Sequence, residues 1–433
     1  ACMCLAAGAL SGIATAGGIG PDVIVGNLDG VSNYGGVGGT RAYAIGTVSC
    51  NIGDDVLLWI DGSNQHPVIG QTVYRLLNGR FEQMGQSWLK HGFAALNGSL
   101  CDSCNPTGFD TLGVGCSDPY SSGLNGQQSN LGTKTQVNAW TGFYNWPFGG
   151  AGQGGNAIFK RVQVAEADLN AGGLWYGGGQ YVTPDDAAAG NQNNNSSWRP
   201  LSRNGFTLQV TSFTRREQAP VYAWKEADAG VDLQELHVSG EGMFNLAARA
   251  YDNGDGTWDY EYALHNQTSH LSADSFSVPA VGVSTSDEGF HDVAYHSGDP
   301  YDGTDWPVTE GGNAVTWTAV DMGTNTNALR WGTMYNFRFT ANTAPTTGDV
   351  EIGMYRSGGP ASITATTVVP SAGQAGCNQA DIAAEFGVLD LQDVQAFIAG
   401  FVGGDLIADM NGDGILDLQD VQQFITAFTA GCP

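Results

Sequence analysis

Residues 386–401 read FGVLDLQDVQAFIAGF and residues 413–428 read DGILDLQDVQQFITAF, and the two stretches are identical at eleven of sixteen positions at an offset of 27 residues. A repeat of this kind indicates two copies of one structural unit. Apolar residues recur at helical spacing in both copies, which predicts two amphipathic helices that pack against each other. The residues of these two stripes are Val394, Phe397, Ile398 and Phe401, and Val421, Phe424, Ile425 and Phe428.

The segment before the second helix has the pattern of a calcium-binding loop. Residues 409–420 read DMNGDGILDLQD. An EF-hand loop takes its ligands from positions 1, 3, 5, 7, 9 and 12 and places a glycine at position 6, where the chain turns sharply. Gly414 stands at that sixth position. The sequence therefore predicts Ca²⁺ as cofactor, with the ligands Asp409, Asn411, Asp413, Ile415 through its carbonyl, Asp417 directly or through water, and Asp420.

The first copy departs from this pattern. Counted back from Asp393, the ligand positions carry apolar residues, namely Ile382, Ala384 and Phe386. The oxygen donors that remain for a candidate second metal site are Asp390 and Asp393, together with Asp381 or Glu385 in a lengthened loop. The sequence thus predicts one calcium site and leaves the second open.

Cysteines bracket the two repeats. The segment begins with Gly376-Cys377-Asn378-Gln379-Ala380-Asp381 and ends with Ala430-Gly431-Cys432-Pro433. Together with the calcium loop, these features resemble the dockerin family in its bacterial form that ends in Gly-Cys-Pro. The resemblance covers residues 377–433. It implies an EF-hand-like helical module, a Cys377–Cys432 disulfide, and a cohesin-like or cell-surface anchoring partner. Because dockerins commonly end secreted polysaccharide-degrading enzymes, it also implies extracellular polysaccharide as a ligand or substrate.

Composition narrows the class of the rest of the chain. The 433 residues include 64 glycines, scattered among short apolar runs, which is typical of tight turns between strands. The chain carries 43 acidic against 16 basic residues, a net charge of −27. Such a charge disfavours nucleic acid as a partner and attracts divalent cations.

The N-terminus indicates export. Residues 5–16 read LAAGALSGIATA and end in Ala14-Thr15-Ala16, the pattern of the apolar region and cleavage site of a secretory signal. We expect residues 1–16 to be a truncated signal peptide; the alternative is an ordinary apolar strand. No later stretch approaches the roughly 20 apolar residues of a transmembrane helix. An extracellular, secreted protein associated with the cell surface is therefore expected.

Cys2 and Cys4 lie within the expected signal peptide, and four further cysteines precede the C-terminal module: Cys50, Cys101, Cys104 and Cys116. The Cys101-x-x-Cys104 spacing alone would also suit zinc or redox chemistry, but no second such pair follows. In an exported chain a disulfide-braced loop is favoured. Three pairings of the four residues remain open.

The body of the chain is predicted to be mainly β, with a β-sandwich or jelly-roll-like architecture. Residues 17–235 form a glycine-rich β domain with one exception, a helical hairpin over 64–96, where apolar residues follow helical spacing on both sides of Asn78-Gly79. Residues 236–342 alternate cleanly, as half-buried strands do, and predict a β-sandwich domain. There, Asp252-Asn253-Gly254-Asp255-Gly256 is expected to be a hairpin turn and not a calcium loop. Residues 343–376 are expected to be a linker.

Two clusters are candidate sites. His66, Arg80, Glu82 and His91 lie in the predicted helical hairpin, where they either form an acid/base or metal site or occupy a solvated helix face. The second cluster contains His291, His296, Asp299 and Asp302. Residues five apart on a strand point to opposite faces, so one strand cannot bring both imidazoles to one ion. If the following loop bends back, His296, Asp299 and Asp302 share a calcium ion; otherwise the segment is an acidic surface loop.

No nucleophile elbow, zinc-protease or phosphate-binding motif is present in the sequence. Carboxylates suited to glycoside hydrolysis are Glu217, Glu226, Glu241 and Glu261, and nothing pairs two of them. Aromatic residues suited to stacking on sugar rings, or else to a core, are Trp140, Tyr144, Trp146, Trp175 and Tyr176.

These patterns predict a secreted protein in which a calcium-binding, dockerin-like module tethers a β-rich body that binds or degrades extracellular polysaccharide. If the body is an enzyme, a hydrolase of O-glycosyl bonds is expected. The alternatives are a non-catalytic surface or matrix protein and a metal-dependent secreted enzyme.

Overall fold

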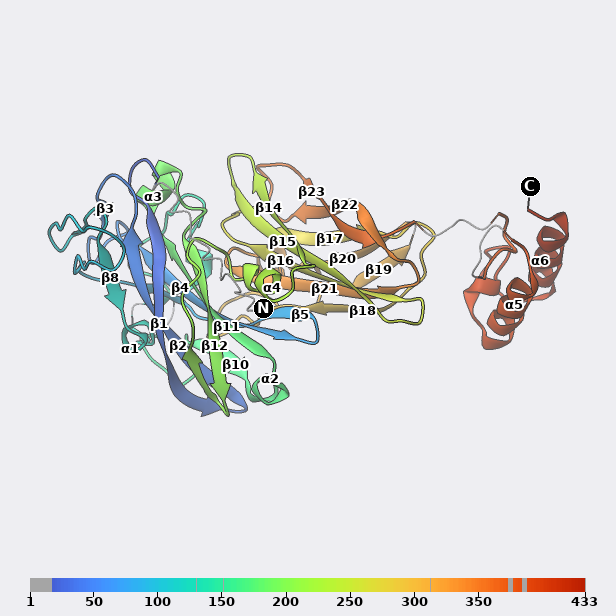
Figure 1. Cartoon of the computed structure of the whole chain (residues 1–433), viewed down its shortest axis with the longest axis horizontal. Coiled ribbons are helices and arrows are strands. Elements are labelled where there is room, and N and C mark those ends of the chain that lie inside the picture. The colour runs from blue at the N-terminus through green and yellow to red at the C-terminus, as the bar shows by residue number, and fades with distance from the viewer. Residues whose placement is uncertain are drawn as a thin grey trace, which may run out of the picture.

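The computed structural model describes residues 18–129, 131–150, 152–311, 313–372, 377–383 and 388–432. Two β-sandwiches lie side by side, and a small helical module follows them at the C-terminal end (Figure 1). The predicted mainly β fold is therefore confirmed for the body. The predicted signal peptide over 1–16 lies outside the described residues.

The first sandwich has two antiparallel sheets. In one, β2 (Thr40–Asn51) pairs with β1 (Val23–Val37) along one edge, and with β10 (Val162–Ala165) and β8 (Ser117–Tyr120) along the other. The other sheet has the order β13 (Thr207–Val210), β12 (Ser196–Asn204), β11 (Leu174–Val182), β4 (Val68–Leu77), β6 (Leu89–His91), β9 (Leu131–Gly132), with β5 (Arg80–Gln86) also on β4. Apolar side chains such as Val25, Ile69 and Tyr181 fill the space between the sheets.

Short elements and two disulfides complete the first part of the chain. The disulfides, Cys50–Cys101 and Cys104–Cys116, brace the loop region beside the first sandwich and resolve the pairing that the sequence left open. The short elements are β3 (Leu57–Leu58), β7 (Thr111–Leu112), α1 (Ser122–Asn125), the 3-10 helix η1 (Lys134–Gln136), α2 (Glu166–Ala171), α3 (Pro184–Ala189) and α4 (Tyr222–Ala227).

The second sandwich also has two antiparallel sheets of five strands each. One has the order β14 (Asp232–Val238), β15 (Gly242–Asp252), β16 (Trp258–Asn266), β21 (Thr333–Ala341), β18 (Thr285–His291). The other has the order β19 (Val308–Gly311), β20 (Ala314–Thr318), β17 (Ala273–Pro279), β22 (Pro345–Met354), β23 (Ser362–Pro370), and the 3-10 helix η2 (Gly323–Asn325) precedes β21. Residues 252–256 make the expected hairpin turn between β15 and β16.

The predicted helical hairpin over 64–96 is wrong, because these residues form strands β4, β5 and β6. Asn78 and Gly79, with φ of 52° and 81°, make the two-residue turn between β4 and β5, which is the typical Asn-Gly hairpin turn. Residues 68–75 are all buried, so the strand lacks the alternation of a half-exposed strand. A continuous apolar run of this kind cannot be distinguished from a helix by its period.

The predicted linker over 343–376 is also wrong for most of its length. Strands β22 and β23 lie within it and complete the second sandwich, which therefore extends from Asp232 to Pro370. Thr364 and Thr366 occupy the exposed positions of β23, while Ala365 and Val369 are buried. The polar composition reflects a hairpin with one solvated face.

The two sandwiches share a buried interface. Strand β5 of the first lies against β16 and β21 of the second, as Figure 1 shows. The Gln83 side-chain oxygen accepts a hydrogen bond from the Met334 amide at 2.7 Å, and Asn336 donates to the carbonyl of Phe81 at 2.8 Å. A second core between the sandwiches contains Tyr74, Phe81, Tyr176, Trp198, Trp224, Ala263 and Met334.

The C-terminal module consists of α5 (Leu391–Gly403), the 3-10 helix η3 (Leu406–Ala408) and α6 (Leu418–Ala430). Phe397 and Phe424 stack at 4.1 Å between the helices, as the sequence pattern predicts. The disulfide Cys377–Cys432 joins the two ends of the module. Ile398 and Ile425, predicted to be in the core, are instead 55% and 54% exposed.

Candidate functional site

The 409–420 loop is organised by its own carboxylates. The two side-chain oxygens of Asp409 accept hydrogen bonds from the amides of Gly412 at 2.9 Å and Gly414 at 2.8 Å. Both glycines have φ above +70°, a conformation that favours glycine. This is the sharp turn that position 6 of a calcium loop requires.

The last predicted ligand holds the loop to the following helix. Asp420 Oδ1 accepts from the amide of Met410 at 2.8 Å, and Oδ2 accepts from the amide of Asp417, which caps α6. These backbone hydrogen bonds, the one from Asp417 above all, lower the pKa of Asp420. The predicted ligands Asn411 and Asp413 also bond to each other, at 3.0 Å.

Among the described residues, three ligand atoms of His, Cys, Asp or Glu lie within 4.8 Å of one another at Cys377, Asp381 and Cys432, and nowhere else. These two cysteines form the disulfide, so that group offers no thiolates. The loop carboxylates stand farther apart than this. The residue types and the turn fit a calcium ion, which would draw the carboxylates together.

The first repeat uses the same hydrogen bonds as the second. Asp393 Oδ1 accepts from the amides of Ile382 and Ala383, and Oδ2 accepts from the amide of Asp390, which caps α5. Asp393 therefore matches Asp420, and Asp381 stands where Asp409 stands. The loop starts are 28 residues apart while the helices are 27 apart, so the first loop is one residue longer. Asp381 Oδ2 accepts from the amide of Cys377 at 2.8 Å, and Glu385 lies outside the described residues, so the second metal site stays a prediction.

The first predicted cluster separates into two parts. His66 and His91 lie buried with ring centroids 4.6 Å apart, and His91 stacks on Trp146 at 3.7 Å. Burial lowers the pKa of both, that of His66 to about 3. Glu82 instead pairs with Arg75 at 3.0 Å, and Arg80 pairs with Glu261 of the second sandwich at 2.6 Å. Arg80 and Glu82 thus belong to ion pairs on β5, and the predicted joint site with His91 is wrong.

The second predicted cluster lies at the boundary between the sandwiches. His291 Nε2 lies 3.3 Å from the carbonyl of Gln83, and His296 Nε2 lies 2.8 Å from the carbonyl of Gln86. The other nitrogen of His296 contacts Ser297 Oγ at 2.9 Å, so both ring nitrogens are engaged. Asp302 accepts from the amide of Thr304 and holds its own turn. The predicted calcium site of His296, Asp299 and Asp302 is therefore not formed.

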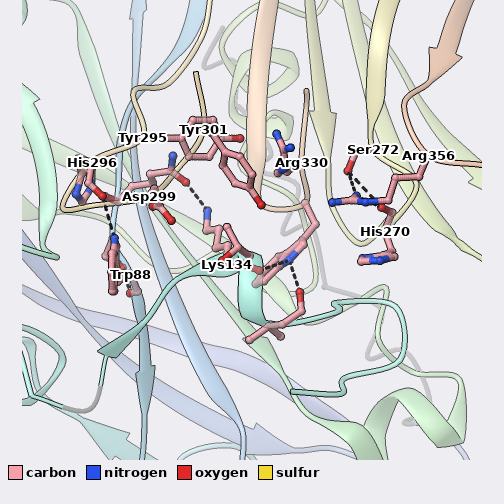
Figure 2. Close-up of a pocket in the computed structure, with 15 residues that line it drawn as sticks. Trp88, Lys134, His270, Ser272, Tyr295, His296, Asp299, Tyr301, Arg330 and Arg356 are labelled. Carbon is pink, nitrogen blue, oxygen red and sulfur yellow. Dashed lines mark hydrogen bonds between the residues drawn. The ribbon is translucent and has the colours of Figure 1, made fainter. Parts of the chain in front are cut away.

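His296 and Asp299 nevertheless line a pocket between the two sandwiches (Figure 2). The first sandwich contributes the segment before β6 and the η1 segment, and the second contributes loops around β18, β21 and β22. The cavity volume is about 20 Å³, which is room for about one water-sized group. Its lining side chains include Trp88, Lys134, His270, Ser272, Tyr295, His296, Asp299, Tyr301, Arg330, Trp331 and Arg356.

Cationic groups dominate this lining, against one carboxylate, that of Asp299. Desolvation lowers the pKa of Lys134 to about 7 and raises that of Asp299 to about 6. Lys134, Arg330 and Arg356 come from distant parts of the sequence and belong to no local motif, so sequence reasoning missed them. The only sequence signal is their rarity in a chain with 16 lysines and arginines.

The candidate carboxylates for hydrolysis lie on separate elements. Glu226 pairs with Arg215, Glu261 pairs with Arg80, and Glu241 accepts from Ser269 Oγ and the Leu271 amide. Glu217 has a left-handed backbone, with φ of 60°. Each of the three paired groups has a structural role, and the arrangement does not single out a catalytic pair.

The candidate aromatics for stacking on sugar rings fall into a buried and a partly exposed group. Tyr144, Trp175 and Tyr176 are buried, whereas Trp140 and Trp146 are partly exposed. Phe143, which the sequence analysis did not single out, is 53% exposed in the same loop as Trp140 and Trp146. An aromatic loop at 140–148 is therefore the part of this set that is open to a ligand.

No family model matches the chain, and no curated protein matches it significantly. Among solved structures, an exo-chitosanase CsxA from Amycolatopsis orientalis is similar, with 11% identity and a TM-score of 0.16 over 75% of this chain. The chain spans 25% of that enzyme's length. A serine-rich repeat adhesion glycoprotein, Srr1, from Streptococcus agalactiae has 7% identity and a TM-score of 0.19 over 79% of this chain and 98% of its own. At such TM-scores the likeness supports no conclusion about function.

Proposed function

We propose that this is an extracellular protein in which a calcium-loaded C-terminal module tethers a β-rich body that binds polysaccharide. The observation that carries the proposal is the 409–420 loop. Every ligand position of a calcium loop is filled there, and the carboxylates of Asp409 and Asp420 already organise the turn and the start of α6. Calcium binding would add its free energy to the folding of a small module.

Exposed apolar residues on the C-terminal module support the proposal that it binds a protein partner. Leu391 and Leu418 are 67% and 68% exposed, and they hold the same position in the two repeats. Ile398 and Ile425, again equivalent, are about half exposed. Exposed apolar residues repeated on two helices fit a docking surface for a cohesin-like or cell-surface partner.

Three disulfides support an oxidising, extracellular location. None of the helices in the described part of the chain is long and apolar enough to cross a membrane. Attachment through the C-terminal module would then hold the body at the cell surface or in a complex.

For the body, we propose polysaccharide binding. The partly exposed rings of the 140–148 loop would stack on sugar rings. The paired carboxylates Glu226 and Glu261 make binding a better-supported role than hydrolysis.

The proposal is tested by calorimetric calcium titration of the full chain. Asp409→Ala should abolish binding at the 409–420 site, whereas Asp255→Ala, in the hairpin turn of the second sandwich, should leave it intact. Absence of calcium binding to the wild-type protein would refute the tethering module.

Polysaccharide binding by the body is tested by mixing the protein with insoluble polysaccharides in the presence of calcium and measuring how much protein leaves the solution. Trp140→Ala and Phe143→Ala should each weaken retention, and Phe213→Ala, an exposed aromatic elsewhere, should not. Equal retention of all variants would contradict the aromatic loop as the binding surface.

A further inference from the structure

The pocket between the two sandwiches concentrates positive charge inside an acidic protein. The whole chain has a net charge of −27, yet Lys134, Arg330 and Arg356 all line one cavity. Two half-buried histidines, His270 and His296, lie beside them. Within the ranges that the structure describes, none of the three cations forms an ion pair with a carboxylate.

Arg330 is the most buried of these cations, at 4% exposure. Its Nη1 and Nη2 donate to the carbonyls of Thr324, Thr326 and Ala328, and its guanidinium lies 3.3 Å from the centroid of the Tyr301 ring. Its Nε is buried and has no hydrogen-bond partner among the described residues. A buried charged donor without a partner is costly, and a bound acceptor would satisfy it.

Arg356 adds a second guanidinium. Its Nη1 donates to Ser272 Oγ at 2.8 Å and to the carbonyl of His270. Arg330 and Arg356 lie 5.3 and 5.5 Å from the ring of Tyr355, and desolvation together with repulsion from Arg330 lowers the pKa of Arg356. Two guanidiniums held beside one ring repel each other; Glu241 offsets this in part at Arg356, and a bound anion would offset it further.

Lys134 provides the third charge, from the first sandwich. Its ammonium donates to Gln86 Oε1 at 2.9 Å and to the carbonyl of Gly332 at 2.7 Å, which are both neutral acceptors. Asp299 is the nearest opposing carboxylate, and its Oδ1 is buried without a hydrogen-bond partner among the described residues. Asp299 is the one carboxylate in the lining, and Glu241 acts on Arg356 from outside it, so two carboxylates oppose three basic side chains.

From this arrangement we propose that the pocket between the sandwiches binds the carboxylate group of an acidic ligand. Guanidinium groups pair with carboxylates through short, charge-assisted hydrogen bonds. A cavity of about 20 Å³ has room for one oxygen of a carboxylate, so the rest of the ligand would lie outside it. A divalent cation is disfavoured there, because three cations would repel it.

The proposed ligand is a sugar acid, which is either free or a uronate residue of a polymer. Only the polymeric source rests on the proposed function; the recognition of a carboxylate does not. Tyr301 and Trp331 would supply the apolar walls beside the acid.

The test is calorimetric titration of the full chain with sodium glucuronate, with glucose as the neutral match and sodium sulfate as the tetrahedral anion. Glucuronate should bind and glucose should not. Arg356→Gln and Lys134→Met should each weaken binding about tenfold or more, the effect of losing a charged hydrogen bond. Arg203→Gln removes a guanidinium from the β12–β13 turn and should change affinity less than about twofold.

The absence of glucuronate binding to the wild-type protein would overturn the proposal, as would equal weakening by Arg203→Gln or binding of sulfate alone. Thermal stabilisation of the wild-type protein by glucuronate over glucose gives a readout that needs no variant. Oligogalacturonate separates the two sources: binding of free acid and oligomer supports a polymeric ligand, and binding of free acid alone supports a small one while contradicting the polysaccharide role.

Discussion

Asp118 makes the stability of the first sandwich depend on pH. This residue of β8 is 1% exposed, and its Oδ1 accepts a hydrogen bond from the amide of Leu96 at 2.7 Å. Desolvation raises the pKa of its carboxyl from 3.8 to about 7. Between these two values the folded protein keeps a proton that the unfolded chain loses. Stability therefore falls as pH rises through this window.

The size of the effect follows from the shift. A difference of about 3 units at 1.36 kcal/mol per unit gives about 4 kcal/mol, most of it lost by pH 7. Asp118→Asn keeps the acceptor for Leu96 and removes the titration. We expect the variant to match the wild-type protein near pH 4 and to exceed it by up to this amount at pH 8.

Urea unfolding from pH 4 to pH 8, followed by tryptophan fluorescence, measures the difference between the two proteins. Contributions of other buried carboxyls are common to both and cancel. Asp255→Asn serves as the control, because Asp255 is exposed and its hydrogen bonds from Thr257 lower its pKa below 3.8, so its titration changes stability mainly below about pH 5. Parallel pH profiles for the wild-type protein and Asp118→Asn would refute the reasoning.

Three further results are expected. Gly79→Val should destabilise the body by about 1–3 kcal/mol more than Gly62→Val, since both have positive φ but only at Gly79 would a Cβ lie 2.8 Å from the Tyr251 ring; calorimetric unfolding with equal losses would exclude the clash. Phe424→Ala should destabilise the C-terminal module by about 3–5 kcal/mol and reduce calcium affinity, measured by circular dichroism and titration, and an unchanged affinity would separate the helix packing from the loop. Glucuronate affinity should fall between pH 6 and pH 8, because the Lys134 ammonium, whose pKa is about 7, loses its proton in this range. The pocket also holds two histidines and the Asp299 carboxyl. An affinity that does not depend on pH would exclude a role for Lys134 in binding.

The C-terminal module was the most predictable part of the chain. Its two helices, the stacked Phe397 and Phe424 and the bracketing disulfide all follow from local spacing and from the repeat. The exposed Ile398 and Ile425 were missed because helical period identifies an apolar stripe, but two short helices cannot cover all of it.

The first sandwich was harder to predict. Strand β4 is buried on both faces, so its apolar run lacks the alternation of a half-exposed strand. Asn78-Gly79, a dipeptide typical of β-hairpin turns, was the available signal for strands in place of helices. Strand β23 was predicted to be part of a linker for the opposite reason. Its exposed face is rich in Thr, and this polar composition is also typical of linkers.

The pocket could not be predicted, because its charges are brought together by the tertiary fold. Lys134 and Arg356 are more than two hundred residues apart in the sequence, and they meet only where two separate sandwiches touch. Of the predicted candidates, His296 and Asp299 lie in the pocket, but their chemistry is set by cations from elsewhere.

The seam formed by β5 has a consequence for how this protein can be inherited. Strand β5 lies against β16 and β21 of the second sandwich, and the two sandwiches bury a shared core in addition to the core of each. Recombination between the two would divide this shared core and expose the aromatic residues Tyr74, Phe81, Tyr176 and Trp198 of the first sandwich to solvent. The helical module, closed on itself by a disulfide, is by contrast suited to exchange among unrelated partners. We therefore expect residues 18–370 to pass between genomes as one piece, while the tail is shuffled.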